Sequence, residues 1–274
     1  MKIGYVCTNY KNSQYTRHAV ESLLRNAGHE IQIVVVDNAS GPEHVADLRR
    51  IADDFGNVTL ICSEENLGYF SGLNLGIRYL REAVPEIDWL IVGNNDLQFP
   101  VDFLDRVQKK LFHLVGHAVI SPDIVTIEGQ HQNPHVISGI GKIRELFYDL
   151  YFSNYYLGMV VIKAAKMLPW LSERRDERQW GVPQHIYQGH GSCYLLGPRF
   201  FEKFDELWAP TFMMYEEYFL SKQLGDAGMK VYYEPAIVVK HDCHGSLRDV
   251  PTRKRWEMAR QAHKEYRKFV KIFG

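Results

Sequence analysis

The sequence has little cysteine: four residues in a chain of 274, with no CxxC pair among them. Scattered single cysteines provide neither a disulfide framework nor a zinc-binding pattern. The chain begins MKIGYVCTNY, which lacks the long apolar core of a secretory signal. We therefore expect a protein of the reducing cytoplasm, in which no chemistry is assigned to Cys7, Cys62, Cys193 or Cys243.

An excess of one charge and long apolar runs are lacking as well. Lys and Arg number 32 against 33 Asp and Glu, a net charge of -1, so we expect no nucleic-acid partner. No run approaches the roughly eighteen apolar residues of a membrane span. With 46% hydrophobic and 24% charged residues, the chain can bury a sizeable core without disulfides or a structural metal.

What is present in the first half is a regular alternation of short apolar runs and amphipathic stretches. This alternation predicts a parallel α/β sheet that is covered by helices on both faces. The expected strands are 2–8, 31–37, 57–62 and 88–93, with helices around 15–26, 43–55 and 68–82. After a helix at 103–114 and a strand at 117–121, residues 122–190 carry several prolines and an aromatic cluster and show no regular pattern. The pattern returns with strands at 192–197, 229–234 and 236–241, a helix beginning near 215 and a last helix from about 252.

Small polar residues follow the predicted strands. Because ligands of such sheets gather at the carboxyl ends of the strands, these residues are candidates for a binding site. The pair Asp37 and Asn38 suits the base or ribose of a nucleotide, although Asp-Asn is also common turn chemistry. Asp96 is a single carboxylate that suits Mg²⁺, which is often held by one or two carboxylates plus substrate phosphates. The full set is Thr8, Asn9, Asp37, Asn38, Asn94, Asn95 and Asp96.

Glycines 68, 72 and 76 fall four apart, on one face of a predicted helix. Something approaches that face closely, either a neighbouring strand or a ligand. Packing is the better explanation for Gly76, whereas Asn66 and Gly68 lie at the helix start, where free amides favour an anion. The spacing is not the GxGxxG dinucleotide fingerprint.

Two further motifs carry titratable groups. VVKHDCHGS delivers His241 and His244 at a strand end; its HDCH resembles a zinc spacing, but a structural zinc needs four protein ligands. Glu216 and Glu217 stand at a helix start, where the helix dipole favours carboxylates. A carboxylate among the aromatic and Met residues there can also have its pKa raised and serve as a general base.

Taken in order, TNY, VVVDNAS, NLGYFSGLNLGI, GNND, MYEEYFLSKQLGDAGMKVYY and VVKHDCHGS resemble the family 2 glycosyltransferases, especially the rhamnosyltransferase-like members. The resemblance implies a GT-A fold, an α/β domain over 1–250 with a mixed, mostly parallel central sheet and helices on both faces. Residues 1–121 would be its nucleotide-sugar half and 122–250 its acceptor and catalytic half, with a basic amphipathic helix at 251–274. The implied activity is inverting transfer from a UDP- or dTDP-type sugar to a saccharide or lipid-linked glycan in surface polysaccharide synthesis.

The same resemblance implies a role for each matched residue. Asp96 and His241 would bind Mn²⁺ or Mg²⁺, and Glu217 or its neighbour Glu216 would be the base. Asn94 replaces the first carboxylate of the family's DxD motif, and Glu217 replaces an Asp. The implied nucleotide-sugar residues are Thr8, Asn9, Asp37, Asn38, Asn66, Gly68, Asn74, Asn94 and Asn95.

The acceptor is expected at the irregular middle segment, where His190 and Trp180 suit a sugar, unless such residues form only a local core. The basic amphipathic C-terminal helix can lie on an anionic bilayer or pack against the domain with its basic face in water. Two other functions stay open: a catalytically silent nucleotide-sugar-binding or scaffold protein of the same fold, and a metal-dependent hydrolase that uses Asp96 and HDCH.

Overall fold

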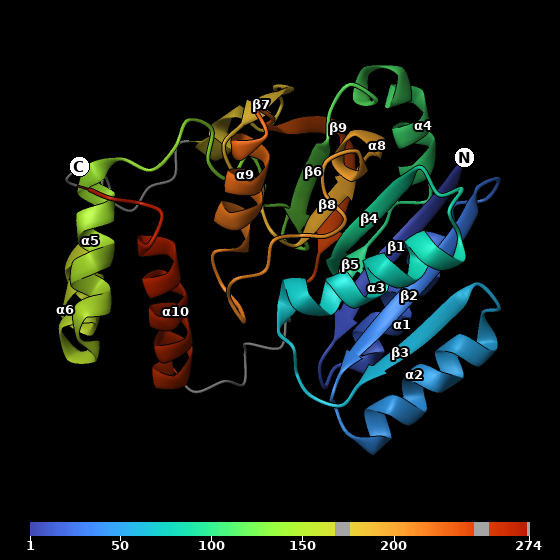
Figure 1. The fold of residues 1–274 in the computed structure, drawn as a ribbon, viewed down its shortest axis with the longest axis horizontal. Coiled ribbons are helices and arrows are strands. Elements are labelled where there is room, and N and C mark those ends of the chain that lie inside the picture. The colour runs from blue at the N-terminus through green and yellow to red at the C-terminus, as the bar shows by residue number, and fades with distance from the viewer. Residues whose placement is uncertain (168–175, 244–251, 273–274) are drawn as a thin grey trace.

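The computed structural model describes residues 1–167, 176–243 and 252–272 (Figure 1). Within these residues the strands form one nine-stranded sheet in the order β3-β2-β1-β4-β8-β6-β9-β5, with β7 also paired to β9. Strands β3, β2, β1 and β4 run parallel to one another. Strand β8 is antiparallel to both of its neighbours, β4 and β6. The bounds are β1 Lys2–Asn9, β2 Glu30–Asn38, β3 Val58–Ser63, β4 Trp89–Asn94, β5 Leu97–Gln98, β6 Val119–Thr126, β7 Gln184–Ile186, β8 Cys193–Leu196 and β9 Val231–His241.

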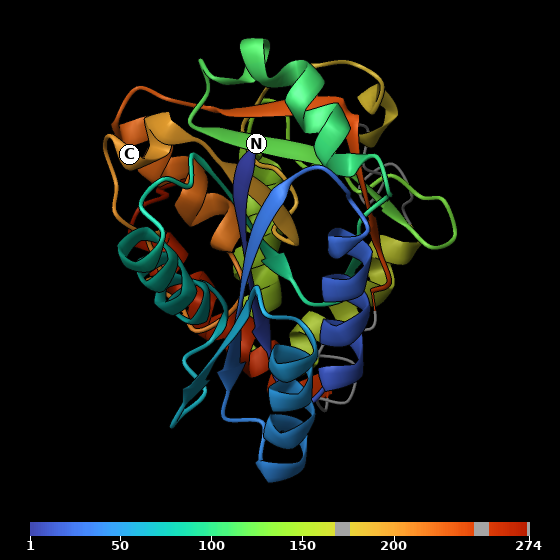
Figure 2. The ribbon, with the colours of Figure 1, turned by 90° about the vertical axis from the view of Figure 1, so that its right-hand side faces the viewer.

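Helices cover both faces of the sheet (Figure 2). One face packs against α1 (Ser13–Leu24), α2 (Pro42–Asp54) and α4 (Phe103–Leu114), and the other against α3 (Tyr69–Ala83), α8 (Pro198–Phe201) and α9 (Glu216–Asp226). Because strand side chains alternate between faces, Tyr5 and Cys7 enter the first core and Val6 the second. The predicted α/β architecture with a mixed, mostly parallel sheet is confirmed.

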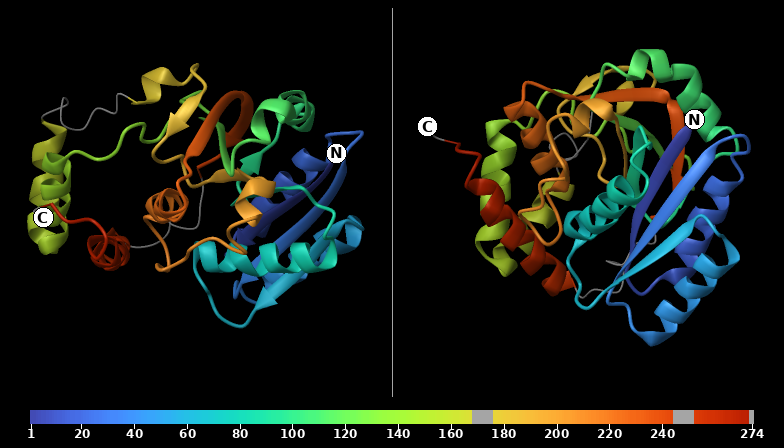
Figure 3. Two further views of the ribbon diagram at one scale, coloured as in Figure 1. Left: turned by 45° about the horizontal axis from the view of Figure 1, so that its top comes forward. Right: turned by 45° about the vertical axis from the view of Figure 1, so that its right-hand side comes forward.

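The middle segment, which shows no regular pattern in the sequence, contains two helices, α5 (Lys142–Ser153) and α6 (Tyr155–Lys166), followed by a short 3₁₀ turn η1 (Asp176–Gln179). Helices α5 and α6, together with α10 (Thr252–Arg267), form what we call the helical lobe, which stands at one end of the molecule (Figure 3). None of the helices in the described ranges has the length and apolar character needed to cross a bilayer.

The aromatic face of α10 packs against the protein. Trp256 Nε1 donates to the Tyr151 carbonyl, and Tyr266 stacks on Tyr215 with ring centroids 4.7 Å apart. His263 Nε2 lies 2.8 Å from Asp149 Oδ1. Of the two alternatives for this helix, packing against the domain is therefore the one observed for its apolar side chains.

One strand assignment from the sequence is wrong. The ranges 229–234 and 236–241 form the single strand β9, which runs through Pro235. The register against β6 shifts between Pro122 and Asp123, so residues 235–237 stand out of the ladder. This β-bulge accommodates Pro235, which has no backbone N–H to donate to the neighbouring strand.

Candidate active site

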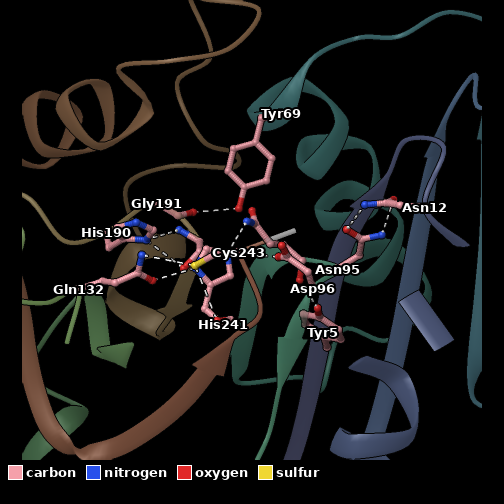
Figure 4. A network of polar contacts seen from close by, with 12 residues as sticks. Tyr5, Asn12, Tyr69, Asn95, Asp96, Gln132, His190, Gly191, His241 and Cys243 are labelled. Atoms are coloured by element: carbon pink, nitrogen blue, oxygen red, sulfur yellow. Dashed lines mark hydrogen bonds and ion pairs between the residues drawn. The ribbon is translucent and has the colours of Figure 1, made fainter. Parts of the chain in front are cut away.

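A cavity of about 310 Å³ opens at the carboxyl ends of β1, β2 and β4, between the starts of α3 and α9. Twelve residues of its surroundings, several in one polar network, are drawn in Figure 4. The cavity combines amides, three carboxylates and three tyrosine rings. It is lined by Thr8, Tyr10, Asn38, Asn66, Gly68, Tyr69, Asn94, Asn95, Asp96, His190, Gly191, Ser192, Met213, Met214, Tyr215, Glu216 and Glu217.

A buried polar network supports one wall of the cavity. Asn9 Nδ2 donates to Asp37 Oδ1 at 2.9 Å, and the Ser40 amide donates to Asp37 Oδ2 at 3.0 Å. Asn95 Nδ2 donates to Thr16 Oγ1 at 2.7 Å. Asn9 and Asp37 are thus engaged behind the wall and do not line the cavity, whereas Asn95 does. Their bonds fix the turns that follow β1 and β2.

The start of α3 approaches the cavity closely. Asn66 Oδ1 accepts the Gly68 amide at 3.0 Å, and Asn38 Nδ2 donates to the Gly68 carbonyl at 2.9 Å, leaving Asn38 Oδ1 buried without a hydrogen-bond partner. Gly68 has a φ of +84°, and a Cβ there would lie 1.9 Å from the Phe212 carbonyl oxygen. Only glycine satisfies both constraints.

The two other glycines of α3 serve packing onto the sheet. A Cβ at Gly76 would lie 2.4 Å from Val6 Cγ1, and one at Gly72 would lie 2.8 Å from Thr8 Cγ2. Asn74, on the same helix, exchanges two hydrogen bonds with the backbone of Leu207, at 2.7 and 2.9 Å. Its side chain holds the segment before α9 and does not line the cavity.

Asp96 and His241 meet at the end of β4, as the sequence motifs suggested. Both Asp96 carboxylate oxygens are buried and have no hydrogen-bond partner, although His241 Nε2 lies 3.3 Å from Oδ1 (Figure 4). His241 Nδ1 lies 2.8 Å from Gln132 Oε1, which can only accept, so the proton of a neutral ring is assigned to Nδ1. Nε2 then presents a lone pair toward the Asp96 carboxylate and the Asn94 Nδ2 amide, each 3.3 Å away. Two electron-rich groups in this position fit a hard or borderline divalent cation.

The zinc site suggested by the HDCH motif is not supported by the described residues. In the described ranges no group of three or more His, Cys, Asp and Glu side chains could hold a metal. His244 lies outside the described residues. A divalent ion here would therefore depend on Asp96 and His241 from the protein and on oxygens of a bound ligand.

Two left-handed residues precede the carboxylate pair at α9. Met214 and Tyr215 have φ values of 77° and 66°, which non-glycine residues adopt at a cost of about 1 kcal/mol or more each. This conformation allows Glu216 Oε1 to accept the Met214 amide at 2.9 Å. Burial, and then the nearby Glu217 carboxylate, raise the pKa of Glu216 to about 8.

Glu217 is held differently. Its Oε1 accepts the Gly191 amide at 3.2 Å, and a Cβ at Gly191 would lie 2.7 Å from the same oxygen. The Tyr69 hydroxyl donates to the Gly191 carbonyl at 2.8 Å, and burial raises the pKa of Tyr69 well above its usual value, so this hydroxyl keeps its proton. Gly191 therefore connects α3 to the base candidate on α9.

The two acceptor candidates lie apart. His190 lines the cavity, with Nδ1 3.0 Å from Ser192 Oγ, while its amide donates to Asn133 Oδ1. Trp180 does not line the cavity; it stacks on His131, with ring centroids 4.1 Å apart.

Sequence reasoning gave no role in this site to Tyr69, Gly191 and Gln132. Tyr69 follows Gly68 directly, so the glycine motif could have included it. Gly191 contributes only backbone atoms here, and Gln132 comes from the irregular segment. No side-chain pattern marks either of them.

Comparison with known proteins defines the class. Residues 5–166 match the family described as Glycosyl transferase family 2, so the chain belongs to this family. The protein is a glycosyltransferase.

Two curated relatives are similar to the chain. One is the N-acetylglucosaminyl-diphospho-decaprenol L-rhamnosyltransferase of Mycobacterium tuberculosis, 26% identical over 89% of this chain and 77% of the relative. The other is the low-salt glycan biosynthesis hexosyltransferase Agl10 of Haloferax volcanii, 24% identical over 78% of this chain and 59% of the relative.

Solved structures support the fold. The mannosyltransferase PcManGT of Pyrobaculum calidifontis, in complex with GDP-Man and Mn²⁺, superposes with a TM-score of 0.57 at 15% identity; the match covers 98% of this chain and 65% of that one. GalNAc-T7 with UDP, GalNAc and Mn²⁺ gives 0.55 at 12% identity over 88% of this chain and 44% of that one. The GT-A fold implied by the resemblance is confirmed.

Proposed function

We propose that this protein is an inverting glycosyltransferase that moves a sugar from a UDP- or dTDP-type donor to a saccharide or lipid-linked glycan in surface polysaccharide synthesis. The observation that carries the proposal is the pairing of Asp96, whose buried carboxylate has no hydrogen-bond partner, with the Glu217 carboxylate in one cavity. The relative from Mycobacterium tuberculosis, named for transfer to a diphospho-decaprenol-linked sugar, supports a lipid-linked acceptor. Free cysteines fit a cytoplasmic location.

The donor is assigned to the wall formed by β1, β2 and the start of α3. Thr8, Asn38, Asn66, Gly68, Asn94 and Asn95 line the cavity and would contact it. Asn9 and Asp37 would act by holding Asn95 and the turn after β2, and Asn74 by holding Leu207. Asp96 and His241 would hold Mn²⁺ or Mg²⁺. When bound, such an ion offsets negative charge on the leaving diphosphate.

Glu217 is the better base. A general base must be ionised, and the raised pKa of Glu216 keeps that carboxyl largely protonated at neutral pH. Glu217 would take the proton of the acceptor hydroxyl while the hydroxyl oxygen forms a bond to the anomeric carbon. The bond from that carbon to the diphosphate oxygen breaks, and the nucleoside diphosphate leaves with the electron pair. One displacement inverts the configuration. His190, which lines the cavity, would contact the acceptor.

Calorimetric titration with UDP-, dTDP- and GDP-sugars, each with Mn²⁺ or Mg²⁺, tests the proposal. We expect metal-dependent binding of one donor that Asp96→Ala weakens by at least about tenfold. Asp53→Ala, an exposed carboxylate on α2, is the matched control and should leave binding unchanged.

Turnover separates the alternatives. Acceptor-dependent release of nucleoside diphosphate supports transfer, whereas donor binding without release would identify a silent nucleotide-sugar-binding protein. Cleavage of phosphate esters without any acceptor would identify a hydrolase. Absence of binding to every donor would overturn the proposal.

A further inference from the structure

The outward face of α5 is apolar. Ile143 is 68% exposed, and Leu146, Phe147 and Leu150 are 37 to 44% exposed. Their spacing of three, four and seven residues places them on one side of the helix. The opposite side carries Glu145, which is buried.

The outward face of α6 has the same character. Tyr156 is 71% exposed and Val160 62% exposed, with Leu157 also exposed. The opposite side carries Gly158, where a Cβ would lie 3.2 Å from Trp256 Nε1 on α10. The two helices therefore both turn a polar or small side toward α10 and an apolar side away from it.

These side chains form one surface, which we call the hairpin face: Ile143, Leu146, Phe147, Leu150, Tyr156, Leu157 and Val160. The α5–α6 hairpin lies at the edge of the molecule, with α10 between it and α9 (Figure 1). Exposed apolar side chains that stand singly are ordinary, but seven on two adjacent helices mark an interaction site.

The hairpin face belongs to a lobe whose charged residues are mostly basic. Residues 142–167 and 252–272 together hold twelve Lys and Arg against four Asp and Glu, in a chain whose net charge is -1. Two of the four acids, Glu145 and Asp149, are paired with Arg267 at 2.9 and 2.6 Å. Lys142, Arg144 and Lys163, on the hairpin itself, are exposed. The lobe is therefore basic, while the rest of the chain is acidic.

We propose that the hairpin face binds the surface of an anionic lipid bilayer. Apolar side chains flanked by Lys and Arg are what an interfacial helix presents to acidic headgroups, and the acidic remainder of the chain would be repelled from the same surface, which sets the orientation. A second copy of the chain is a poorer partner, because a two-fold contact through this face would oppose two basic rims. The proposal does not depend on the identity of the donor or the acceptor.

Sedimentation with vesicles tests the inference. The full chain is mixed with vesicles of phosphatidylcholine containing about one third phosphatidylglycerol, or of phosphatidylcholine alone. We expect binding to the anionic vesicles that weakens with salt, a loss of about tenfold or more in the double variant Leu146→Gln, Val160→Gln, and a loss of several-fold in Lys142→Glu, Arg144→Glu.

The matched control is Phe112→Gln, Val115→Gln, which removes two exposed apolar side chains at the end of α4, 87% and 51% exposed. It should bind vesicles like the wild type. Urea unfolding of every variant shows that each is folded, and donor titration in parallel keeps this test separate from that of the sugar transfer.

Three results would overturn the inference. One is wild-type protein that stays in the supernatant with anionic vesicles, and another is equal binding by the hairpin variant and the wild type. The third is a dimer in sedimentation equilibrium that the hairpin variant dissociates, because the face would then be a contact between copies.

Discussion

The sheet half and the helical lobe distribute their side chains in opposite ways. In the sheet half, apolar residues such as Leu73 are fully buried, and buried polar residues such as Asn9 and Asp37 pair with one another behind the cavity wall. In the lobe, the side of α5 that faces α10 carries the paired Glu145 and Asp149, while Leu146 and Leu150 face outward. The sheet half thus buries most of its large apolar side chains in its own core. The lobe instead leaves the apolar side chains of the hairpin face exposed.

The largest effect is expected in the chemistry of the sheet half. Glu217→Gln should lower the turnover number by about 10²- to 10⁴-fold, because a general base is lost, while donor affinity stays within a few-fold. Glu216→Gln should reduce turnover much less, because burial raises the pKa of its carboxyl and favours the protonated form. Nucleoside diphosphate release with acceptor measures both. A larger loss in Glu216→Gln would assign the base to Glu216.

The contrast in burial can be measured directly. Leu73→Ala, in the core of α3, should lower the free energy of unfolding by about 3 kcal/mol, since it leaves a cavity. Leu150→Ala, a half-exposed leucine on α5, should change it by no more than about 0.5 kcal/mol. Urea unfolding of the two variants compares the same chemical change in the two regions. Equal losses would mean that the lobe is packed like the core.

A third pair of substitutions tests the close contact between Gly68 and Phe212 at the cavity wall. Gly68→Ala should destabilise the protein by about 2 kcal/mol more than Gly28→Ala. Both glycines have a φ near +84°, but a Cβ at Gly28 meets nothing within 4 Å, whereas one at Gly68 meets the Phe212 carbonyl. Thermal or urea unfolding gives the difference. If the two variants lose the same stability, the contact with Phe212 is not a constraint.

Taken per pH unit, the smallest effect is the pH dependence from Glu216. Its pKa in the folded protein, about 8, lies above the usual value for an unfolded chain, so the native state binds more protons between these two values. The contribution of Glu216 to stability should therefore fall as the pH rises from about 4.5 to 8, by at most about 1.4 kcal/mol per pH unit. Unfolding at several pH values, in wild type and Glu216→Gln, isolates this slope. A variant with the wild-type slope would contradict the raised pKa.

The same contrast explains what the sequence could predict. In the sheet half, apolar periodicity reflects burial, so β1 to β4 and the helices up to residue 114 follow from the pattern, and the polar residues at strand ends lead to the cavity; the two-residue strand β5 is too short to give such a pattern. In the lobe, exposed apolar side chains and aromatic residues give no clear period, so α5 and α6 were not predicted. Gly191 contacts Glu217 through its backbone, which no residue pattern records. The sequence pattern predicts two strands separated by Pro235, whereas β9 is one strand. The bulge that accommodates Pro235 depends on the register against β6, which the sequence does not reveal.

The hydrogen bonds of Tyr69 restrict how the walls of the cavity can move relative to one another. Its amide donates to the Phe212 carbonyl at 3.0 Å, and its hydroxyl donates to the Gly191 carbonyl, whose residue in turn binds Glu217. If these bonds are preserved, the start of α3, the backbone at Phe212 and the Glu217 side chain move together as one rigid body. The cavity has no hinge between its donor wall and its base within this connection. Any widening of the cavity between α3 and α9 therefore requires movement of this body against β4 and β9, or the breaking of one of these bonds.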